Sequence, residues 1–316
     1  MIETEKEKYD EGSENMSMIT GKDMIPYLAQ TYQQLYLVPG KPGSAEAYKD
    51  IVLSGQDAPE HDLSHFLMND EDCFELLDTP AGPVQTVTLH EREDFELFLQ
   101  ILGNKCIPYE VPATQGAVIL DGLVNWQKIR DHKAAWKTEM LERGELFPDW
   151  SAEFKRFTAD RSNYRDALII LSTGPYSNIP ASAVGLDEEE WRRLSLIIRK
   201  YHECTHFVCR RTCPGNINAV RDEIVADAAG IIAAFGKFDP ETEELFFGIK
   251  GSRYLGGRLE NYVSSEDEDM DRLAAKVHEA IMRIDGLYDD LYDGLRASDQ
   301  DAAPFAFALR LTEVLM

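Results

Sequence analysis

Residues 197–231 read IIRKYHECTHFVCRRTCPGNINAVRDEIVADAAGI, and this stretch decides the fold and the function that we expect. Its first motif is HECTH at 202–206, with two histidines four residues apart and a glutamate directly after the first. In an α-helix, residues i and i+4 lie one above the other on the same face, so both imidazoles can bind one metal ion. The spacing therefore predicts a helix that carries two metal ligands.

A second motif, DEIVAD at 222–227, completes the predicted metal site. Catalytic zinc usually has three protein ligands and keeps a fourth position for water. We expect His202, His206 and Glu223 to be those ligands. Glu203 follows His202 directly, so it is turned away from the ligand pair but stays beside the metal. There it can act as the general base that accepts a proton from a water molecule at the metal.

The residues around both motifs are typical of two consecutive helices. Asp187 starts the first helix as its N-cap, and apolar residues recur through it at helical spacing. The Pro-Gly pair at 214–215 ends it. The second helix is expected to start near Asn216 or Asn218 and to stop at Gly236.

Together the two motifs resemble those of the zincin metallopeptidases, and within them the gluzincins, which have HExxH on one helix and an acidic motif on the next. The resemblance covers only the stretch quoted above. It implies the same three zinc ligands and the same general base. It also implies that Asp227 orients His202 and that Asp222 supports His206 in the same way.

The same resemblance implies an oxyanion stabiliser downstream of the ligands, since zincins often use a Tyr, His or Arg for this purpose. Tyr254 is the residue that we expect in this role. Arg253, Arg258, Tyr262 and His278 are the alternatives. Packing without a catalytic role is the other possibility for each of them.

The apolar run DALIIL at 166–171 predicts a strand ahead of the zinc helix. In zincins the edge of such a strand pairs with an extended peptide substrate, which is a form of β-augmentation. By this resemblance, residues 172–178 would line the cleft. A core strand without any role in substrate binding is the alternative.

Two other groups of side chains could bind a metal. His61 and His65 repeat the i, i+4 spacing, but their surroundings read as a solvated loop without a second motif, so we expect no site there. Cys209 and Cys213 lie on the histidine face of the zinc helix. Thiolate ligation would leave Glu223 without a role, so we expect both cysteines to be small buried hydrophobic residues.

Composition and charge narrow the possible partners and the location. With 57 acidic and 32 basic residues the chain has a net charge of −25. Phosphate binding requires clustered Lys and Arg, so we expect neither nucleic acid nor membrane as a partner. Five cysteines without a regular framework indicate a reducing compartment. Because no signal peptide or long apolar run is found either, we expect a cytoplasmic protein.

The fold class that we expect is α+β and mostly helical, with the zincin-like helix pair beside a small sheet. Residues 1–18 are expected to form a disordered tail, 19–160 an N-terminal α/β region, and 161–316 the metal-binding region, unless the last two form one continuous domain. A second strand is expected at 83–89, and residues 112–126 are expected to be a strand or a buried loop. Further helices are expected at 25–37, 45–53, 91–102, 125–143, 240–247, about 265–295 and 302–315.

These observations favour a zinc-dependent hydrolase, specifically a metallopeptidase that cleaves peptide or protein substrates with metal-activated water. Two alternatives stay open at this point. One is a metal-dependent amidohydrolase that acts on a non-peptide small molecule. The other is a non-catalytic protein in which zinc only ties two helices together.

Overall fold

The computed structural model describes residues 18–213, 219–263, 269–296 and 301–315. Over these residues the fold is α+β and mostly helical, which confirms the predicted class. The expected tail at 1–17 and the expected helix starts at 216, 218, 264 and 265 lie outside the described residues. Met18, which was assigned to the tail, begins the first strand.

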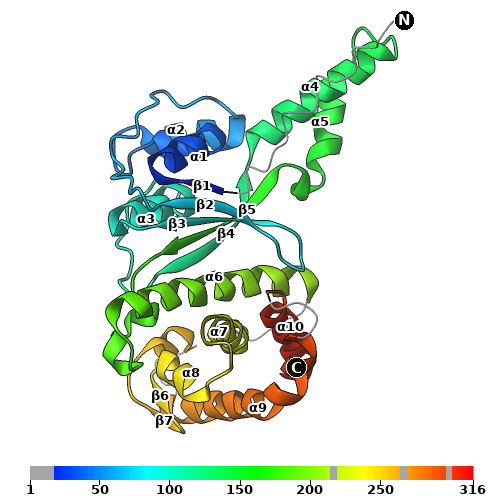
Figure 1. The fold of residues 1–316 in the computed structure, drawn as a ribbon. Coiled ribbons are helices and arrows are strands. Elements are labelled where there is room, and N and C mark those ends of the chain that lie inside the picture. Colours follow the sequence, from blue (N-terminus) through cyan, green and yellow to red (C-terminus); the bar gives the residue numbers. More distant parts are fainter. Residues whose placement is uncertain (1–17, 214–218, 264–268, 297–300, 316) are drawn as a thin grey trace, which may run out of the picture.

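A five-stranded mixed sheet with the order β1-β2-β3-β5-β4 forms the upper half of the molecule (Figure 1). Strands β3 and β5 are parallel, and the other neighbours are antiparallel. The most buried strand is β5, in which Leu168 to Leu171 are inaccessible to solvent because both faces of the sheet are covered. The strands are β1 (Met18–Thr20), β2 (Cys73–Leu77), β3 (Val84–Leu89), β4 (Ala117–Val124) and β5 (Arg165–Ser172).

Helices cover the two faces of the sheet unequally (Figure 1). On one face lie α1 (Met24–Thr31), α2 (Ser44–Ser54) and α3 (Arg92–Phe98), which continues as a π-helical turn at Leu99–Gly103. On the other face lies the long helix α6 (Glu188–Thr212). Leu168 and Ile170 point into the first core, whereas Ile169 and Leu171 point toward α6. This alternation places α6 directly against the central strand.

The C-terminal helices pack beneath α6 around a second large core. Helix α7 lies against α6, and α8, α9 and α10 surround it (Figure 1). Trp191 and Ile198 of α6 contribute to this core from above. The elements are α7 (Ala219–Phe235), α8 (Pro240–Phe247), the small strands β6 (Ile249–Lys250) and β7 (Arg253–Tyr254), α9 (Met270–Arg296) and α10 (Ala303–Leu315).

Helices α4 (Trp126–Glu142) and α5 (Trp150–Thr158) form an arm that projects away from the body (Figure 1). Aromatic contacts hold the two helices together, including Trp136 with Trp150 and His132 with Phe157. The arm follows directly from the edge strand β4. Asn125 lies between the two elements, and its side chain caps the start of α4.

Several sequence predictions differ from this fold. The helix expected at 25–37 ends at Thr31 and is followed by a 3-10 turn at Gln33–Tyr36. Strand β5 is paired on both sides, so it cannot offer an edge to a peptide, and the edge strand beside α6 is β4. A boundary at 160/161 would cut through one sheet, because β5 pairs with β3 and β4, and this favours the alternative of one continuous domain. Strand β2 and helix α5 were not predicted. In β2, Leu76 is exposed and Glu75 pairs with Lys200, so the apolar alternation that marks a strand is weak.

Candidate metal centre

Helix α6 carries the first motif. One residue at its start determines where it begins, and a glycine of α7 determines how closely the two helices approach each other. The Asp187 carboxylate accepts a hydrogen bond from the Glu190 amide at 2.8 Å, which caps the helix as predicted. Gly230 of α7 has no side chain at the crossing point. A Cβ atom there would lie 2.8 Å from the Ile198 carbonyl oxygen, so glycine permits the close contact between the two helices.

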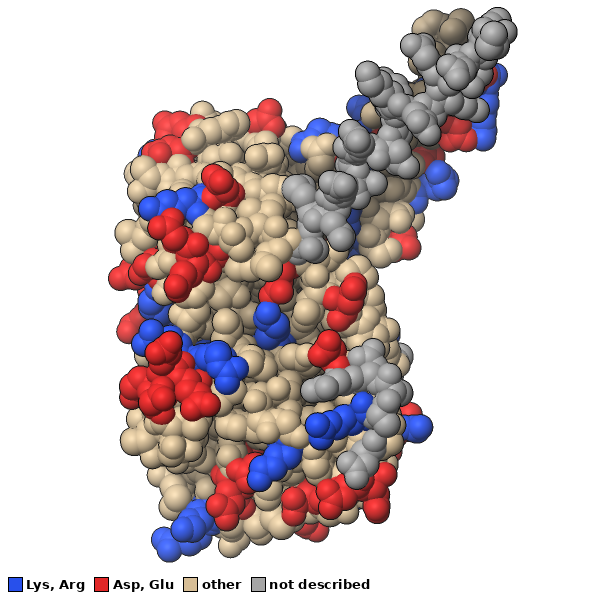
Figure 2. Space-filling model, viewed as in Figure 1, with Lys and Arg blue, Asp and Glu red and all other residues tan. Residues whose placement is uncertain are grey.

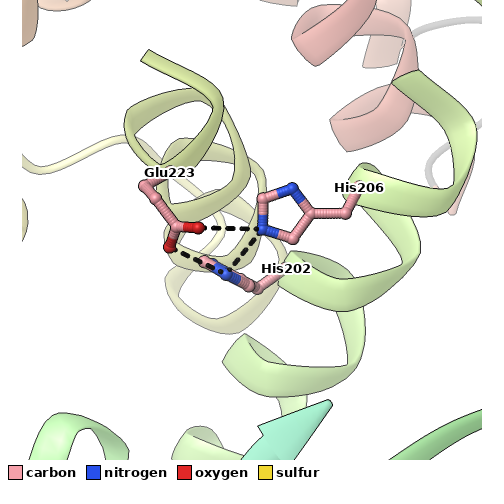
Figure 3. A group of neighbouring side chains, drawn as sticks. All are labelled: His202, His206 and Glu223. Carbon is pink, nitrogen blue, oxygen red and sulfur yellow. Dashed lines mark hydrogen bonds and ion pairs between the residues drawn. The ribbon is translucent and has the colours of Figure 1, made fainter. Parts of the chain in front are cut away.

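The structure brings His202, His206 and Glu223 together between α6 and α7 (Figure 3). The two histidine Nε2 atoms are 3.1 Å apart. Glu223 Oε2 lies 3.5 Å from His202 Nε2, and Oε1 lies 3.5 Å from His206 Nε2. Both histidines are more than nine-tenths buried. Among the described residues, this is the one group of three such side chains that could hold a metal ion.

The spacing of these donor atoms fits a zinc ion. Zinc is usually tetrahedral, with bonds of about 2.0–2.1 Å to nitrogen and oxygen, and this places neighbouring donor atoms about 3.3 Å apart. The three observed separations of 3.1, 3.5 and 3.5 Å lie on either side of that value. Two imidazoles and one carboxylate are also a donor set that catalytic zinc sites use.

Both histidines have a carboxylate behind them. Asp227 Oδ1 lies 2.8 Å from His202 Nδ1, and Asp222 Oδ2 lies 2.9 Å from His206 Nδ1. At His202 the carboxylate forms a hydrogen bond with Nδ1 and holds the proton on that nitrogen, so Nε2 keeps its lone pair for a metal. Asp222 lies at ion-pair distance from His206 without an aligned hydrogen bond. These are the contacts that the resemblance implies for Asp227 and Asp222.

Asp227 lies at the centre of a larger buried network. The Tyr176 hydroxyl donates to Asp227 Oδ1 at 2.5 Å and lies 3.1 Å from His202 Nδ1. Arg258 pairs with the other oxygen of Asp227 and donates to the Tyr176 hydroxyl at 3.0 Å. Three donors therefore fix a carboxylate that is fully buried, and this carboxylate fixes His202.

The pKa shifts describe a strongly polarised cluster. Burial opposes the charged form of each group, but the carboxylates of Asp227 and Glu223 outweigh it and raise the pKa of His202 to about 10. Burial also works against ionisation of Glu223, yet the two histidines hold the pKa of this carboxyl far below its usual range. In the absence of a metal, positive charge is therefore favoured at the point where the ligand atoms meet.

Glu203 lies beside this cluster and keeps its carboxylate available. It is about nine-tenths buried, and it has no hydrogen-bond or ion-pair partner within the described ranges. Its carboxylate oxygens are not among the fully buried atoms that lack a hydrogen-bond partner, so they keep contact with solvent. This position is the one that a general base beside a metal requires.

The expected oxyanion stabiliser does not reach the cluster. The Tyr254 hydroxyl contacts the backbone of Gly257 and the carboxylate of Glu260 instead. Tyr262, one of the alternatives, donates from its hydroxyl to Glu223 Oε2 at 2.8 Å. Tyr262 and Arg258, rather than Tyr254, are thus the downstream side chains at the site.

The other sequence candidates have local roles. His61 stacks on Tyr36, and His65 contacts a backbone carbonyl. His278 pairs with Glu244, away from the cluster. Cys209 is buried, and the Cys213 sulfur contacts a threonine hydroxyl, so neither thiol is among the clustered donor atoms.

Two residues, one in the network and one beside it, were not predicted from the sequence. Tyr176 lies in the loop between β5 and α6, where Ser177 and Asn178 have positive φ angles of 49° and 57°. Its backbone amide donates to the buried hydroxyl of Ser195, which anchors the loop to α6. Glu243 of α8 is fully buried near Asp227, and burial raises the pKa of its carboxyl well above the usual range. No local pattern signals either residue.

The surface and the helices give further information on partners. On the face shown in Figure 2, Lys and Arg side chains are interspersed with acidic ones and form no extended basic patch. No helix in the described part of the chain has the length and apolar character needed to cross a membrane.

Comparisons with known proteins give a family without an assigned activity. Neither the curated proteins nor the solved structures contain a match to this chain. A family profile described as a family of unknown function, DUF7005, matches residues 20–315. The chain therefore belongs to the DUF7005 family.

Proposed function

We propose that this protein is a zinc-dependent hydrolase of the zincin type that cleaves peptide bonds. The observation that carries the proposal is the convergence of His202, His206 and Glu223 at tetrahedral zinc spacing, with the unpaired carboxylate of Glu203 beside them. A structural zinc site has four protein ligands and no open coordination position, and it does not need a general base beside the metal. The described residues supply three ligands and one base.

Each residue has a defined task in the proposed reaction. His202, His206 and Glu223 would hold the metal, which, when bound, lowers the pKa of a water molecule and polarises the scissile carbonyl. Glu203 removes a proton from the attacking water as a C–O bond forms at the carbonyl carbon. Glu203 then passes this proton to the leaving nitrogen as the C–N bond breaks. The products are a carboxylic acid and an amine.

Tyr262 replaces Tyr254 as the proposed oxyanion stabiliser. Its hydroxyl already lies at the ligand cluster, 2.8 Å from Glu223. Burial raises the pKa of Tyr262 above its ordinary value, so the hydroxyl stays protonated and can donate at neutral pH. A donor at this place can bind the negative oxygen of the tetrahedral intermediate.

The open edge of β4 favours a peptide over a small amide as the substrate. Ser172 donates from its amide to the Gly116 carbonyl oxygen, so Gly116 faces β5. Because the hydrogen-bonding direction alternates along an antiparallel strand, Ala117 and Ile119 turn their backbone groups outward. No described strand pairs with this edge. An extended peptide can add itself there as a further strand.

Glu203→Gln tests the proposal against its alternatives. The variant keeps the shape of the side chain but cannot accept a proton, and the loss of a general base typically costs 10²–10⁴-fold in kcat. We expect zinc content to be unchanged and cleavage of a mixed peptide library to be lost. Glu190→Gln, on the exposed first turn of the same helix, is the matched control and should retain activity.

Two results would contradict the peptidase assignment. Cleavage of small amides but of no peptide would favour the amidohydrolase. Zinc that binds tightly to a protein without any hydrolytic activity would favour a structural role.

A further inference from the structure

A basic cavity adjoins the proposed metal centre. It has a volume of about 460 Å³ and opens where the parallel strands β3 and β5 end. Its lining includes three arginines and a histidine but no aspartate or glutamate. In a chain with 57 acidic and 32 basic residues, a cavity without any acidic residue is unexpected. The residues that matter below are Arg92, Arg192, Arg199, Gly116 and the backbone of 172–175.

Arg199 is a buried cation without a carboxylate partner. Its side chain is only 4% exposed, and no ion pair to it is found within the described part of the chain. Its Nη atoms donate to the backbone carbonyl oxygens of Ser172, Gly174 and Pro175. Burial lowers the pKa of Arg199 to about 10, so the guanidinium remains charged at neutral pH. This buried charge is offset by the carbonyl dipoles and by the Glu203 carboxylate one turn further along α6, with which it forms no ion pair, and it favours the binding of an anion.

Arg192 offers a second cation on the same side of α6. It precedes Arg199 by seven residues, about two helical turns, so both side chains project toward the cavity. Arg192 is exposed and has no hydrogen-bond or ion-pair partner among the residues described. Arg92, in contrast, is neutralised by Glu96 and donates to the carbonyl oxygens of Gln115 and Pro112. The free positive charge therefore belongs to Arg192 and Arg199.

The cavity lies next to the residues of the proposed reaction. Arg199 is one turn before Glu203 on α6, about 6 Å along the helix axis. Its guanidinium lies 5.7 Å from the centre of the Tyr176 ring, whose hydroxyl contacts His202. Gly116, immediately before edge strand β4, packs on the same guanidinium. A Cβ atom on Gly116 would lie 2.4 Å from Arg199 Nε, so only glycine leaves this space open.

We propose that this cavity is a subsite for a carboxylate, which Arg199 and Arg192 bind, and that the substrate is a peptide with an acidic side chain near the scissile bond. The substrate part rests on the proposed function, because a peptide paired with β4 passes Gly116 and can direct a side chain onto Arg199. The carboxylate site itself depends only on the two arginines and on the cavity.

Isothermal titration calorimetry of the full-length protein with two blocked amino acids tests the site without relying on hydrolysis. N-acetyl-glutamate amide and N-acetyl-glutamine amide have nearly the same shape and differ by one charge. We expect the glutamate compound to bind about tenfold more tightly, since charge-assisted hydrogen bonds to arginine are the stronger kind. Arg192→Gln should remove this preference. Arg193→Gln, on the adjacent exposed position that does not line the cavity, should keep it.

Several results would overturn the proposal. Equal binding of the two compounds, or binding that Arg192→Gln leaves unchanged, would exclude a carboxylate site in this cavity. Inorganic phosphate that binds more tightly than the glutamate compound, and competes with it, would overturn the carboxylate assignment. If the protein hydrolyses no substrate but still prefers the glutamate compound, the proposed hydrolase function is wrong and the proposed carboxylate subsite stands.

Discussion

Asp227 shows how single residues far apart in the sequence prepare one metal ligand. Its carboxylate oxygens contact the Tyr176 hydroxyl, from the loop before α6, and Arg258, from the segment before α9. Because Asp227 also contacts His202, both residues influence this histidine through the Asp227 carboxylate. Partners of this kind fix the orientation and tautomer of a metal-binding histidine. Tyr176 is therefore a positioning residue.

Tyr176→Phe should weaken zinc binding about 10–100-fold, which is the typical effect of losing such a partner. The ring still fills its place, so the free energy of unfolding of the metal-free protein should fall by only about 1 kcal/mol. Competition with a chelator measures the zinc affinity. Tyr254→Phe is the control, because its hydroxyl serves only Gly257 and Glu260. Equal losses in the two variants would refute the positioning role.

Glu243 is a second residue whose chemistry can be tested by itself. Both of its carboxyl oxygens are buried without a partner among the described residues. Burial raises the pKa of Glu243 in the folded state, so folding favours the protonated form. Its contribution to stability is then present below the unfolded pKa of about 4.3 and is lost as pH rises toward the folded pKa.

Glu243→Met should stabilise the protein by about 1–3 kcal/mol at pH 8, because a buried polar group without a partner is removed. The gain should shrink at pH 5, where the carboxyl of the parent protein is already neutral. Thermal unfolding at both pH values measures this difference. Glu241→Met, on the exposed side of the same helix, should show no pH-dependent gain. A destabilised Glu243→Met variant at pH 8 would contradict the account.

The site residues that could be predicted from the sequence are those that lie about one helical turn apart on the same helix. His202 and His206 share a face by their spacing, and DEIVAD places Glu223 and Asp227 on a common face of the next helix. Tyr176 and Glu243 reach the site only through the tertiary fold. Tyr254, the residue expected as oxyanion stabiliser, sits on β7, where its hydroxyl holds the turn at Gly257 instead.

Among the elements, edge strand β4 is the one on which substrate recognition depends. The sequence predicts a strand ahead of α6 at DALIIL and leaves open whether this strand pairs with the substrate or belongs to the core; in the structure it is a core strand. An uninterrupted apolar run is typical of a strand that is buried on both faces and paired on both sides. The weaker pattern at 112–126, with its small residues, is the one that forms the edge. Strand order is a tertiary property that local patterns do not contain.

Ala117→Pro should reduce peptide cleavage without loss of zinc. Proline removes an outward N–H group that β5 does not use, so the sheet is kept while one hydrogen bond to a paired peptide is lost. We expect kcat/KM to fall about tenfold, the equivalent of one hydrogen bond of about 1–1.5 kcal/mol. Ala117→Ser retains the N–H group and should behave like the parent protein. Unchanged kinetics in the proline variant would place the substrate elsewhere.

At the scale of the whole molecule, helix α6, which carries the two histidines, joins parts of the chain that otherwise pack into separate cores. Helix α6 packs against the sheet with Phe207 and Val208, and it packs against the C-terminal helices with Trp191 and Ile198. The two His ligands come from α6, and Glu223 comes from α7. Any ion that binds there stabilises the contact between the two helices, because the unfolded chain does not preserve the site.

Zinc at about 100 times its dissociation constant should therefore stabilise the protein by about 2.7 kcal/mol and raise its melting temperature. His206→Ala should abolish this shift, since it removes a ligand. His278→Ala, which removes a histidine from a pair with Glu244 outside the cluster, should retain the shift. Thermal unfolding with and without zinc makes the comparison. A zinc-dependent shift that survives His206→Ala would locate the ion at another site.

X-ray absorption spectroscopy of the zinc-loaded full-length protein tests the central claim most directly, because it reports the atoms around the metal. We predict one zinc ion per chain with two imidazole nitrogens, carboxylate oxygen and one further oxygen from solvent, at about 2.0–2.1 Å. A sulfur atom at about 2.3 Å, which only Cys or Met could supply, or a shell of four protein ligands without solvent, would contradict a catalytic site at His202, His206 and Glu223.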